Sequence, residues 1–200
     1  LQEITISYDA KPGRTDTNWG FFAAPNTTKQ EYEKEHYIGA LINGGKTTIE
    51  RYNNNGPRPT NISAATGTDW VHVDVVLKKD ATILYVDGLK QGVQASSYSL
   101  PDILGQNSIF QIGKANWGDS GEYSKMWIDN FTIYGSALTD ADLIDPEKAR
   151  PLVQAAKEAL TIPGQQTVDF ALPQEGGNST EISWNVKGSS SNLSIQDGIA

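Results

Sequence analysis

From Ile4 to Tyr134 the apolar residues of this chain come in short runs, each bounded by Gly, Pro, Asn or Asp. In the run Trp70–Leu77 apolar and polar residues largely alternate, which places them on opposite faces of an extended strand. The pair Asp87-Gly88 ends the next run and is typical of a tight hairpin turn, whose two central residues need a positive φ. Short strands joined by turns, with no helices between them, predict an antiparallel all-β sandwich or barrel.

The strands are expected at the alternating or continuous apolar runs of this region. Trp19, Trp70 and Trp127 lie within or beside such runs, so all three are predicted to be core residues. The expected strands are Ile4–Tyr8, Gly20–Ala24, Tyr37–Ile42, Thr47–Tyr52, Trp70–Leu77, Thr82–Val86, Ser108–Ile112 and Trp127–Tyr134.

The pattern changes to helical spacing in the segment Leu138–Leu160. Thr139, with Asp142 three residues later, is a plausible N-cap, and Pro146 and Pro151 are expected to divide the segment into short helices. After residue 162 alternation returns, but the remaining residues are too few for an independent sandwich. The predicted domains are a β-sandwich at 1–145, a helical linker at 146–161 and a partial β domain at 162–200.

The composition excludes several classes of partner. A net charge of −8 is unsuited to nucleic acid or to an anionic membrane surface, while an acidic surface is compatible with a neutral partner such as a sugar. The chain has no cysteine, which excludes disulfides and thiolate metal sites. No apolar run is long enough to span a membrane. Because the first residues already alternate like a strand, we expect the chain to start inside a longer natural protein.

Catalytic constellations are missing from the sequence. Glycanases built on sandwiches of this kind need two closely spaced carboxylates, and the strand that could carry them offers Asp74 without a glutamate partner. Asp140 and Asp142 sit at a helix start, where acids interact favourably with the helix dipole. His36 and His72 have no metal-ligand spacing, and His72 is interpreted as a sheet residue. Nucleophile-elbow and phosphate-loop motifs are also absent.

Four blocks of the sequence resemble the laminin-G-like, concanavalin A-like jelly-roll family in order and spacing. The resemblance covers roughly residues 1–145, and it is most similar to the form attached to secreted bacterial glycoside hydrolases of the arabinofuranosidase type. The blocks are WVHVDVVL (70–77), ILYVDG (83–88), FQIG (110–113) and MWIDNFTIYGSALTDADL (126–143). Family members usually have a further strand before Ile4, so truncation, or completion of the sheet by another segment, is expected.

The resemblance has further implications. The tail from residue 160 resembles the start of an atypical bacterial immunoglobulin-like domain, a module common beside such enzymes. Family members often hold a structural calcium ion through Asp, Asn and carbonyl oxygens, and the matching candidates are Asp16 and Asp129. An extracellular or cell-surface bacterial location and an adjacent glycosidase domain would follow.

Sugar recognition needs an aromatic face and planar polar groups that pair with hydroxyls. Two stretches offer this combination, Glu50–Asn53 and Lys114–Asp119. In a regular strand Glu50 and Arg51 point to opposite faces, so both can line one groove only across a bulge. The predicted carbohydrate-binding residues are Tyr37, Glu50, Arg51, Asn116, Trp117 and Asp119.

The sequence therefore predicts a non-catalytic, carbohydrate-binding or ancillary module of a secreted bacterial glycoside hydrolase. A protein-binding adhesion module and a structural spacer are the alternatives. An adhesion module would show a contiguous apolar or charged patch, whereas in a spacer the candidate residues would be buried or paired with one another.

Overall fold

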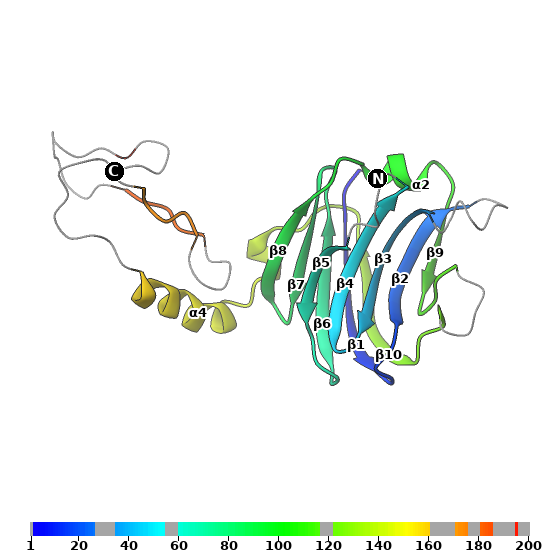
Figure 1. Cartoon of the computed structure of the whole chain (residues 1–200), viewed down its shortest axis with the longest axis horizontal. Helices are drawn as coiled ribbons and strands as arrows, with labels where there is room; N and C mark the ends of the chain where they lie inside the picture. Colours follow the sequence, from blue (N-terminus) through cyan, green and yellow to red (C-terminus); the bar gives the residue numbers. More distant parts are fainter. Residues whose placement is uncertain are drawn as a thin grey trace. The chain divides into compact units, whose positions relative to one another are not determined.

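The structure is a computed structural model that describes residues 2–26, 35–54, 60–116, 122–160, 171–175, 181–185 and 195. Contacts divide the chain into two compact units, residues 1–145 and 146–200. The first unit consists of two facing five-stranded sheets (Figure 1). Every strand pair in both sheets is antiparallel. The predicted all-β sandwich is confirmed, and the arrangement is consistent with a jelly roll.

The two sheets are named here A and B. Sheet A contains, in spatial order, β10 (Met126–Tyr134), β1 (Ile4–Pro12), β6 (Val71–Leu77), β7 (Ala81–Val86) and β8 (Leu89–Ala95). Sheet B contains β5 (Thr60–Ala65), β4 (Lys46–Asn53), β3 (His36–Asn43), β2 (Asn18–Pro25) and β9 (Ser108–Ile112). Strand β5 is additional to the expected ones, and β8 is the strand into which the expected Asp87-Gly88 turn leads.

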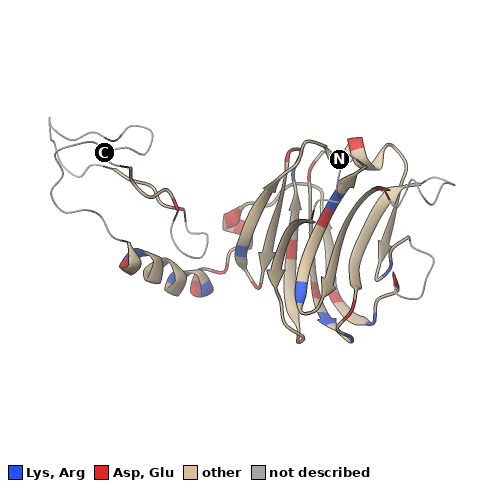
Figure 2. Cartoon of the chain, in the orientation of Figure 1, with Lys and Arg blue, Asp and Glu red and all other residues tan. Residues whose placement is uncertain are grey.

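The main core lies between the inner faces of the sheets. It is built from every second residue of the strands, for example Val71, Val73, Val75 and Leu77 of β6. This is the arrangement that period-2 alternation predicts. The turn Asp87-Gly88 has φ values of 52° and 76°, as expected for the hairpin. Charged residues lie mainly near strand ends and in turns (Figure 2).

Helix α2 (Leu100–Leu104) buries Leu100 and Ile103 in the main core. It starts with a capping box in which Ser99 and Asp102 satisfy each other's backbone N–H groups. Its sequence signal is Ser-x-x-Asp, and this helix was not among the expected elements.

Two further helices follow the sandwich. Helix α3 (Asp140–Leu143) has the expected capping box between Thr139 and Asp142. Helix α4 (Pro146–Ala159) begins at a proline, as predicted, but continues through Pro151, so the expected division there is wrong. Pro151 deprives the Glu147 carbonyl of its helical donor, and this loss is confined to the first turn. None of the described helices has the length and apolar character needed to cross a membrane.

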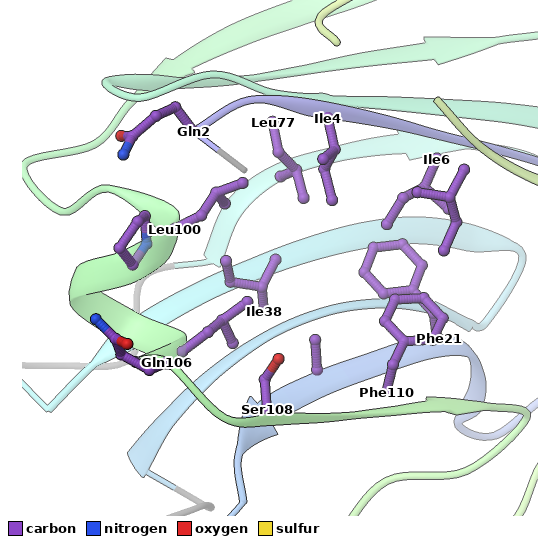
Figure 3. Close-up of a pocket in the computed structure, with 15 residues that line it drawn as sticks. Gln2, Ile4, Ile6, Phe21, Ile38, Leu77, Leu100, Gln106, Ser108 and Phe110 are labelled. Atoms are coloured by element: carbon purple, nitrogen blue, oxygen red, sulfur yellow. The ribbon is translucent and has the colours of Figure 1, made fainter. Parts of the chain in front are cut away.

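An apolar groove of about 690 Å³ opens between the two sheets (Figure 3). It lies on the side where β9 and β10 are the outermost strands. Phe110 of β9 and Ile133 of β10 line the groove and are exposed. Deeper in, Ile4, Ile6, Phe21, Ile38 and Leu77 complete its walls, with Leu100 and Leu104 from α2.

In the second unit the described residues beyond α4 include an isolated bridge between Glu175 and Glu181. The indole nitrogen of Trp184 donates a hydrogen bond to the Pro173 carbonyl at 2.6 Å. Most of the predicted partial immunoglobulin-like domain at 162–200 lies outside the described residues.

Candidate functional site

The outer face of sheet B holds two of the predicted sugar-binding residues. Tyr37 of β3 and Glu50 of β4 meet there, and the Tyr37 hydroxyl donates a hydrogen bond to Oε2 of Glu50 at 2.5 Å. Tyr37 is fully buried. The structure therefore brings this predicted pair together, but the phenol ring presents no open platform to a sugar.

The same face is closed by an aromatic cluster of Trp19, Phe22 and Tyr37. The rings of Phe22 and Tyr37 stack at 5.0 Å between centroids, and Trp19 meets Phe22 edge-on at 5.5 Å. The Trp19 indole N–H donates to Oε2 of Glu122 at 2.5 Å. Trp19 is 3% exposed, which confirms its prediction as a core residue.

Arg51, also predicted to contact sugar, points to the opposite side of sheet B and is 4% exposed. Its guanidinium donates to the carbonyls of Lys78, Lys79 and Ala81 at 2.9–3.1 Å, and also to the Tyr98 carbonyl. Burial lowers the pKa of Arg51, which the nearby carboxylates partly counteract. Its role in the structure is to hold the turn between β6 and β7 against the chain that leads into α2.

Asn116 follows β9 and accepts a hydrogen bond from the side chain of Gln111. Gln111 pairs with Phe22 across the sheet, so Asn116 belongs to the same outer face as Tyr37 and Glu50. Trp117 and Asp119, the remaining predicted residues, lie outside the described residues. The predicted site on sheet B thus stays a prediction.

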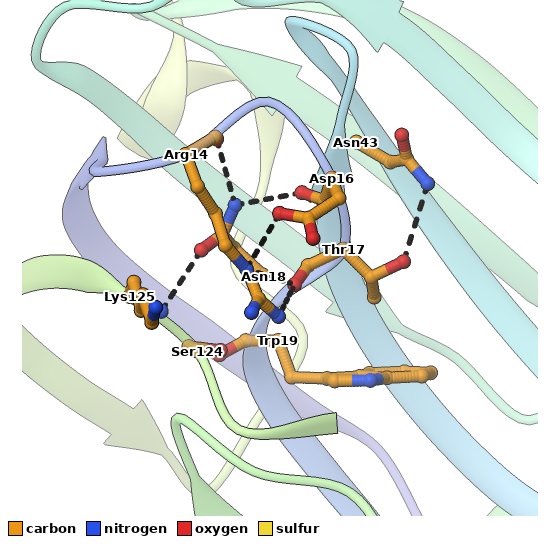
Figure 4. A network of polar contacts seen from close by, with 8 residues as sticks. All are labelled: Arg14, Asp16, Thr17, Asn18, Trp19, Asn43, Ser124 and Lys125. Carbon is orange, nitrogen blue, oxygen red and sulfur yellow. Dashed lines mark hydrogen bonds and ion pairs between the residues drawn. The ribbon is translucent and has the colours of Figure 1, made fainter. Parts of the chain in front are cut away.

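The candidate calcium ligands lie on different elements. Asp16 is in the turn between β1 and β2, where its carboxylate pairs with Arg14 Nε at 2.7 Å (Figure 4). Asn18 braces this turn by donating to the Arg14 and Asp16 carbonyls. Asp129 is on β10, on the outer face of sheet A. In the part of the chain that the structure describes, no group of three or more His, Asp or Glu residues could hold a metal ion. Asp16 and Asp129 lie on different elements, and a calcium site that uses either of them stays a prediction.

Sheet A corrects the prediction for the other two tryptophans. Trp70 is 50% exposed and Trp127 is 60% exposed, so neither is a core residue. Their neighbours in sequence, Val71 and Ile128, are the residues that point inward and pack in the core. Alternation identifies two faces of a strand but not which of them will be covered, and both tryptophans lie on the uncovered one.

Only part of the outer face of sheet A is covered. Ala137, Leu143 and Ile144 from the segment after β10 pack on Val76 and Ile83. Thr5 fastens this segment by donating to the Ser136 carbonyl and accepting from the Leu138 N–H. The tryptophans lie at the other end of the sheet.

Two rows of residues lie side by side at that open end, one with both tryptophans and one that is polar. Trp127 on β10 pairs in register with Lys11 on β1, and Trp70 directly precedes the residue paired with Ala10. The backbones of the two tryptophans are therefore about 10 Å apart, which is two strand spacings. The adjacent row crosses three strands and ends at the turn after β7. We call these residues together the tryptophan face: Lys11, Trp70 and Trp127 in one row, and Asp129, Asp9, His72 and Asp87 in the next.

The polar row is fixed by hydrogen bonds. His72 Nδ1 donates to Asp9 Oδ1 at 2.6 Å, and the other Asp9 oxygen accepts from the Asn130 amide at 2.6 Å. His72 Nε2 lies 3.3 Å from Oδ2 of the buried Asp74. The backbone N–H of His72 donates to Asp87 Oδ1 at 3.0 Å. Above this row is an open hollow of about 370 Å³, lined by Asp9, Trp70, Val71, His72, Asp87 and Asp129.

His72 also lies 3.4 Å from the hydroxyl of Ser7, which gives a Ser-His-Asp arrangement with Asp9. Hydrogen bonds to Asp74 and Asp9 raise the pKa of His72 to about 9, against the burial that lowers it. The ring is therefore an imidazolium at neutral pH and cannot take a proton from Ser7, as a general base must. The protonated ring instead links Asp9 and Asp74 across the outer face of the sheet.

The comparison with known protein families matches this architecture. A family model described as the concanavalin A-like lectin/glucanases superfamily matches residues 1–144. The chain is a member of the concanavalin A-like lectin/glucanase superfamily. The matched residues include every strand of both sheets, and therefore both outer faces described above. Comparison with curated protein sequences found no match.

Solved structures similar to this concanavalin A-like chain include three with low sequence identity. Domain 4 of AbnA, an extracellular arabinanase from Geobacillus stearothermophilus in complex with arabinotriose, is 21% identical with a TM-score of 0.52. The alignment covers 72% of this chain and 67% of that domain. The CBM40 domain of the Ruminococcus gnavus IT-sialidase, bound to α2,3-sialyllactose, is 12% identical with a TM-score of 0.54 and coverages of 72% and 81%.

The third is a heptameric SAP-like pentraxin from Limulus polyphemus. It is 16% identical with a TM-score of 0.52, and the alignment covers 72% of this chain and 68% of the pentraxin. At these identities the likeness supports the concanavalin A-like fold and says nothing about individual site residues.

Proposed function

We propose that this chain is a non-catalytic carbohydrate-binding module and that the tryptophan face is its binding surface. The observation that carries the proposal is the exposure of Trp70 and Trp127 beside a fixed row of polar groups. Exposed indole rings offer large, rigid apolar surfaces to the C–H faces of sugar rings. The carboxylates of Asp87 and Asp129 are exposed and accept hydrogen bonds from sugar hydroxyls.

Preorganisation also favours this surface. The hydrogen bonds among Asp9, His72, Asp74 and Asn130 hold the floor of the hollow in one arrangement before any ligand arrives. A fixed floor lowers the entropic cost of binding. The hollow is shallow, so a single site is expected to bind weakly, and retention on a polysaccharide would come from tethering or from repeated contacts.

The solved structures lend support at the level of fold. Domain 4 of the arabinanase is described in complex with arabinotriose, and the sialidase domain is described bound to sialyllactose. We propose that this chain is likewise an ancillary module of a secreted bacterial glycoside hydrolase, with an adjacent glycosidase domain and an extracellular or cell-surface location. In this proposal the tail is the start of an immunoglobulin-like domain. The proposal also includes a structural calcium ion, and the effect of a chelator tests for the ion.

Affinity electrophoresis of the whole chain against arabinan, arabinogalactan, fructan and host-type glycans, with and without a chelator, tests the proposal. Trp70→Ala and Trp127→Ala should each weaken retention at least tenfold. Val93→Ala serves as the matched control, because Val93 is an exposed apolar residue on β8, away from this face. Asn116→Ala and Trp117→Ala test the predicted site on sheet B in the same gels.

Each outcome has a clear meaning. Loss of retention in the sheet A variants alone supports the tryptophan face, and loss in the sheet B variants alone moves the site to the predicted residues. If the folded chain is retained by none of these glycans, carbohydrate binding is wrong. The adhesion or spacer alternatives would then replace it.

A further inference from the structure

The tryptophan face contains a row of three side chains that point away from the core. Trp127 on β10 pairs in register with Lys11 on β1. Because Ala10 pairs with Val71, the antiparallel register places Trp70 next to Lys11 on its other side. Trp70 is 50% exposed and Trp127 is 60% exposed, and 38% of the Lys11 side chain is exposed. The two indole rings are therefore on either side of Lys11.

Both tryptophans have contacts that relate them to β1. Cζ3 of Trp127 lies 3.4 Å from the position that a methyl group on Gly13 would take, so this ring leans over the backbone just after β1. On the other side of the row, Asp69 Oδ1 accepts hydrogen bonds from the Trp70 N–H and from Lys11 Nζ, both at 2.9 Å. The row is thus held together through its middle strand.

No strand continues the row at either end within the part of the chain that the structure describes. On one side β10 is the outermost strand of sheet A. On the other side β7 pairs with β6 only from Val73 to Leu77, so it ends before it reaches Trp70. A long molecule that lies along the row can therefore extend beyond both tryptophans.

From this geometry we propose that the tryptophan face binds an internal stretch of an extended glycan chain, with Trp70 and Trp127 stacking on two different sugar units. This inference rests on the proposed function and names the class of ligand. The backbones of the tryptophans are about 10 Å apart and Lys11 stands between them, so one sugar ring does not cover both indoles. The ligand is a linear chain of roughly three or more linked sugars, whose middle unit crosses Lys11.

Two linked contacts bind a chain more tightly than one contact does. Once one sugar unit is held on the first indole, the chain presents another unit to the second indole at a high effective concentration. A sugar on a single exposed ring buries little surface and is held weakly, so most of the affinity should come from this linkage. Affinity should therefore depend on chain length in a way that a site for one sugar does not.

Competition in affinity electrophoresis of the whole chain measures this dependence. The gel contains the polysaccharide retained in the screen above, and the competitor is its own series from the single sugar to the hexasaccharide. The probes are arabino-oligosaccharides for arabinan, galacto-oligosaccharides for arabinogalactan, fructo-oligosaccharides for fructan and oligo-N-acetyllactosamines for host-type glycans. Potency should rise about tenfold between the disaccharide and the tetrasaccharide and change little beyond it. Equal molar potency along the series would overturn this inference.

Variants assign the length dependence to the two rings. Trp70→Ala and Trp127→Ala should each weaken the hexasaccharide about tenfold but the disaccharide at most about twofold, because a disaccharide can use the remaining ring. Trp127→Tyr keeps an aromatic surface and should keep most of the length dependence. The control Val93→Ala should change the binding of neither ligand. Circular dichroism of each variant verifies that the chain is folded.

Partial hydrolysis of the polysaccharide separates internal from terminal recognition. Hydrolysis multiplies the chain ends while the mass of polymer stays the same. The amount of protein bound per mass of polymer, measured by analytical ultracentrifugation, should stay constant until the fragments become shorter than the row. Binding that rises in proportion to the number of chain ends would overturn an internal site.

The failures of the two proposals are distinguishable. If Trp70→Ala and Trp127→Ala weaken every member of the series equally, or if only one of them has an effect, the face binds glycans through one sugar unit. This inference is then wrong and the proposed function stands. If neither variant changes the retention of the polysaccharide, or if the folded wild-type chain is retained by no glycan, both proposals fall.

Discussion

A methyl group on Gly39 would lie 2.6 Å from Cζ3 of Trp19, so the indole ring occupies the space that a side chain at residue 39 would need. Gly39 is on β3 and pairs with Phe22 of β2. The register of β2 shifts between Trp19 and Phe21, and this irregularity puts Trp19 and Phe22 on the same face of sheet B. One glycine thus makes room for the aromatic cluster.

Gly39→Ala should therefore destabilise the chain by about 2 kcal/mol, because the added methyl group forces the Trp19 ring out of its packed position. Urea unfolding followed by circular dichroism measures this loss. In the background of Trp19→Phe, whose smaller ring lacks Cζ3, the same substitution should cost much less. Equal costs in both backgrounds would contradict the contact.

Removal of the side-chain hydroxyl should change the free energy of unfolding in opposite directions at Tyr8 and at Tyr37. The Tyr8 hydroxyl is buried, and among the described residues it has no hydrogen-bond partner, whereas the Tyr37 hydroxyl donates to Glu50. Tyr8→Phe should raise the free energy of unfolding by about 1 kcal/mol, and Tyr37→Phe should lower it by about 1–2 kcal/mol. A loss of stability in Tyr8→Phe would show that this hydroxyl has a partner, such as a water molecule.

Arg51 should prove to be a stabilising residue, because its guanidinium is buried and donates to four carbonyls. Arg51→Ala should lower the free energy of unfolding by about 3 kcal/mol or more. Arg51→Lys should recover little of this loss, since an ammonium group cannot reproduce the planar fork. Full recovery by lysine in denaturant unfolding would mean that charge alone matters at this position.

The stability of the chain should fall between about pH 6.5 and pH 9 through His72. Hydrogen bonds to Asp74 and Asp9 raise its pKa from 6.5 to about 9 in the folded chain, so the folded state binds the proton more tightly than the unfolded state. The resulting stabilisation is fully present below about pH 6.5 and is lost as the pH rises through about 9. Ser7, Asn130 and Asp87 are the other polar groups around the ring.

Thermal unfolding across this pH range, followed by circular dichroism, measures the effect. His72→Gln should flatten the dependence, while His36→Gln, which alters a histidine on the other sheet, should preserve it. A wild-type profile that matches His72→Gln would refute the role of the imidazolium.

The sequence predicted the sandwich well because most strands show their pattern within their own residues. Trp70–Leu77 and Ser108–Ile112, for example, were expected almost as the structure has them. Strand β5 was missed because Thr60–Ala65 contains a single large apolar residue, and the pairing with β4 determines its conformation.

The candidate site was harder to predict, because it depends on which outer face remains uncovered. Tyr37 looked available for sugar and is buried, whereas Trp70 and Trp127 looked buried and are exposed. For the tryptophans the distinction arises from the segment after β10, which covers one end of sheet A only. The contact between this segment and sheet A is a tertiary contact, and it leaves no periodic pattern in the sequence. Tyr37 is buried by its packing with Trp19 and Phe22 on sheet B. The opposite orientation of Glu50 and Arg51, in contrast, follows from alternation and was expected.

The groove between β9 and β10 has a practical consequence for every unfolding experiment on this chain. Dyes such as anilinonaphthalene sulfonate fluoresce when they enter apolar surfaces, and a folded protein usually offers them little. Here Phe110 and Ile133 expose the side of the core in the folded state. The dye should therefore fluoresce brightly with the native chain and give a first signal that imitates a partly unfolded protein, while intrinsic signals still report a cooperative fold.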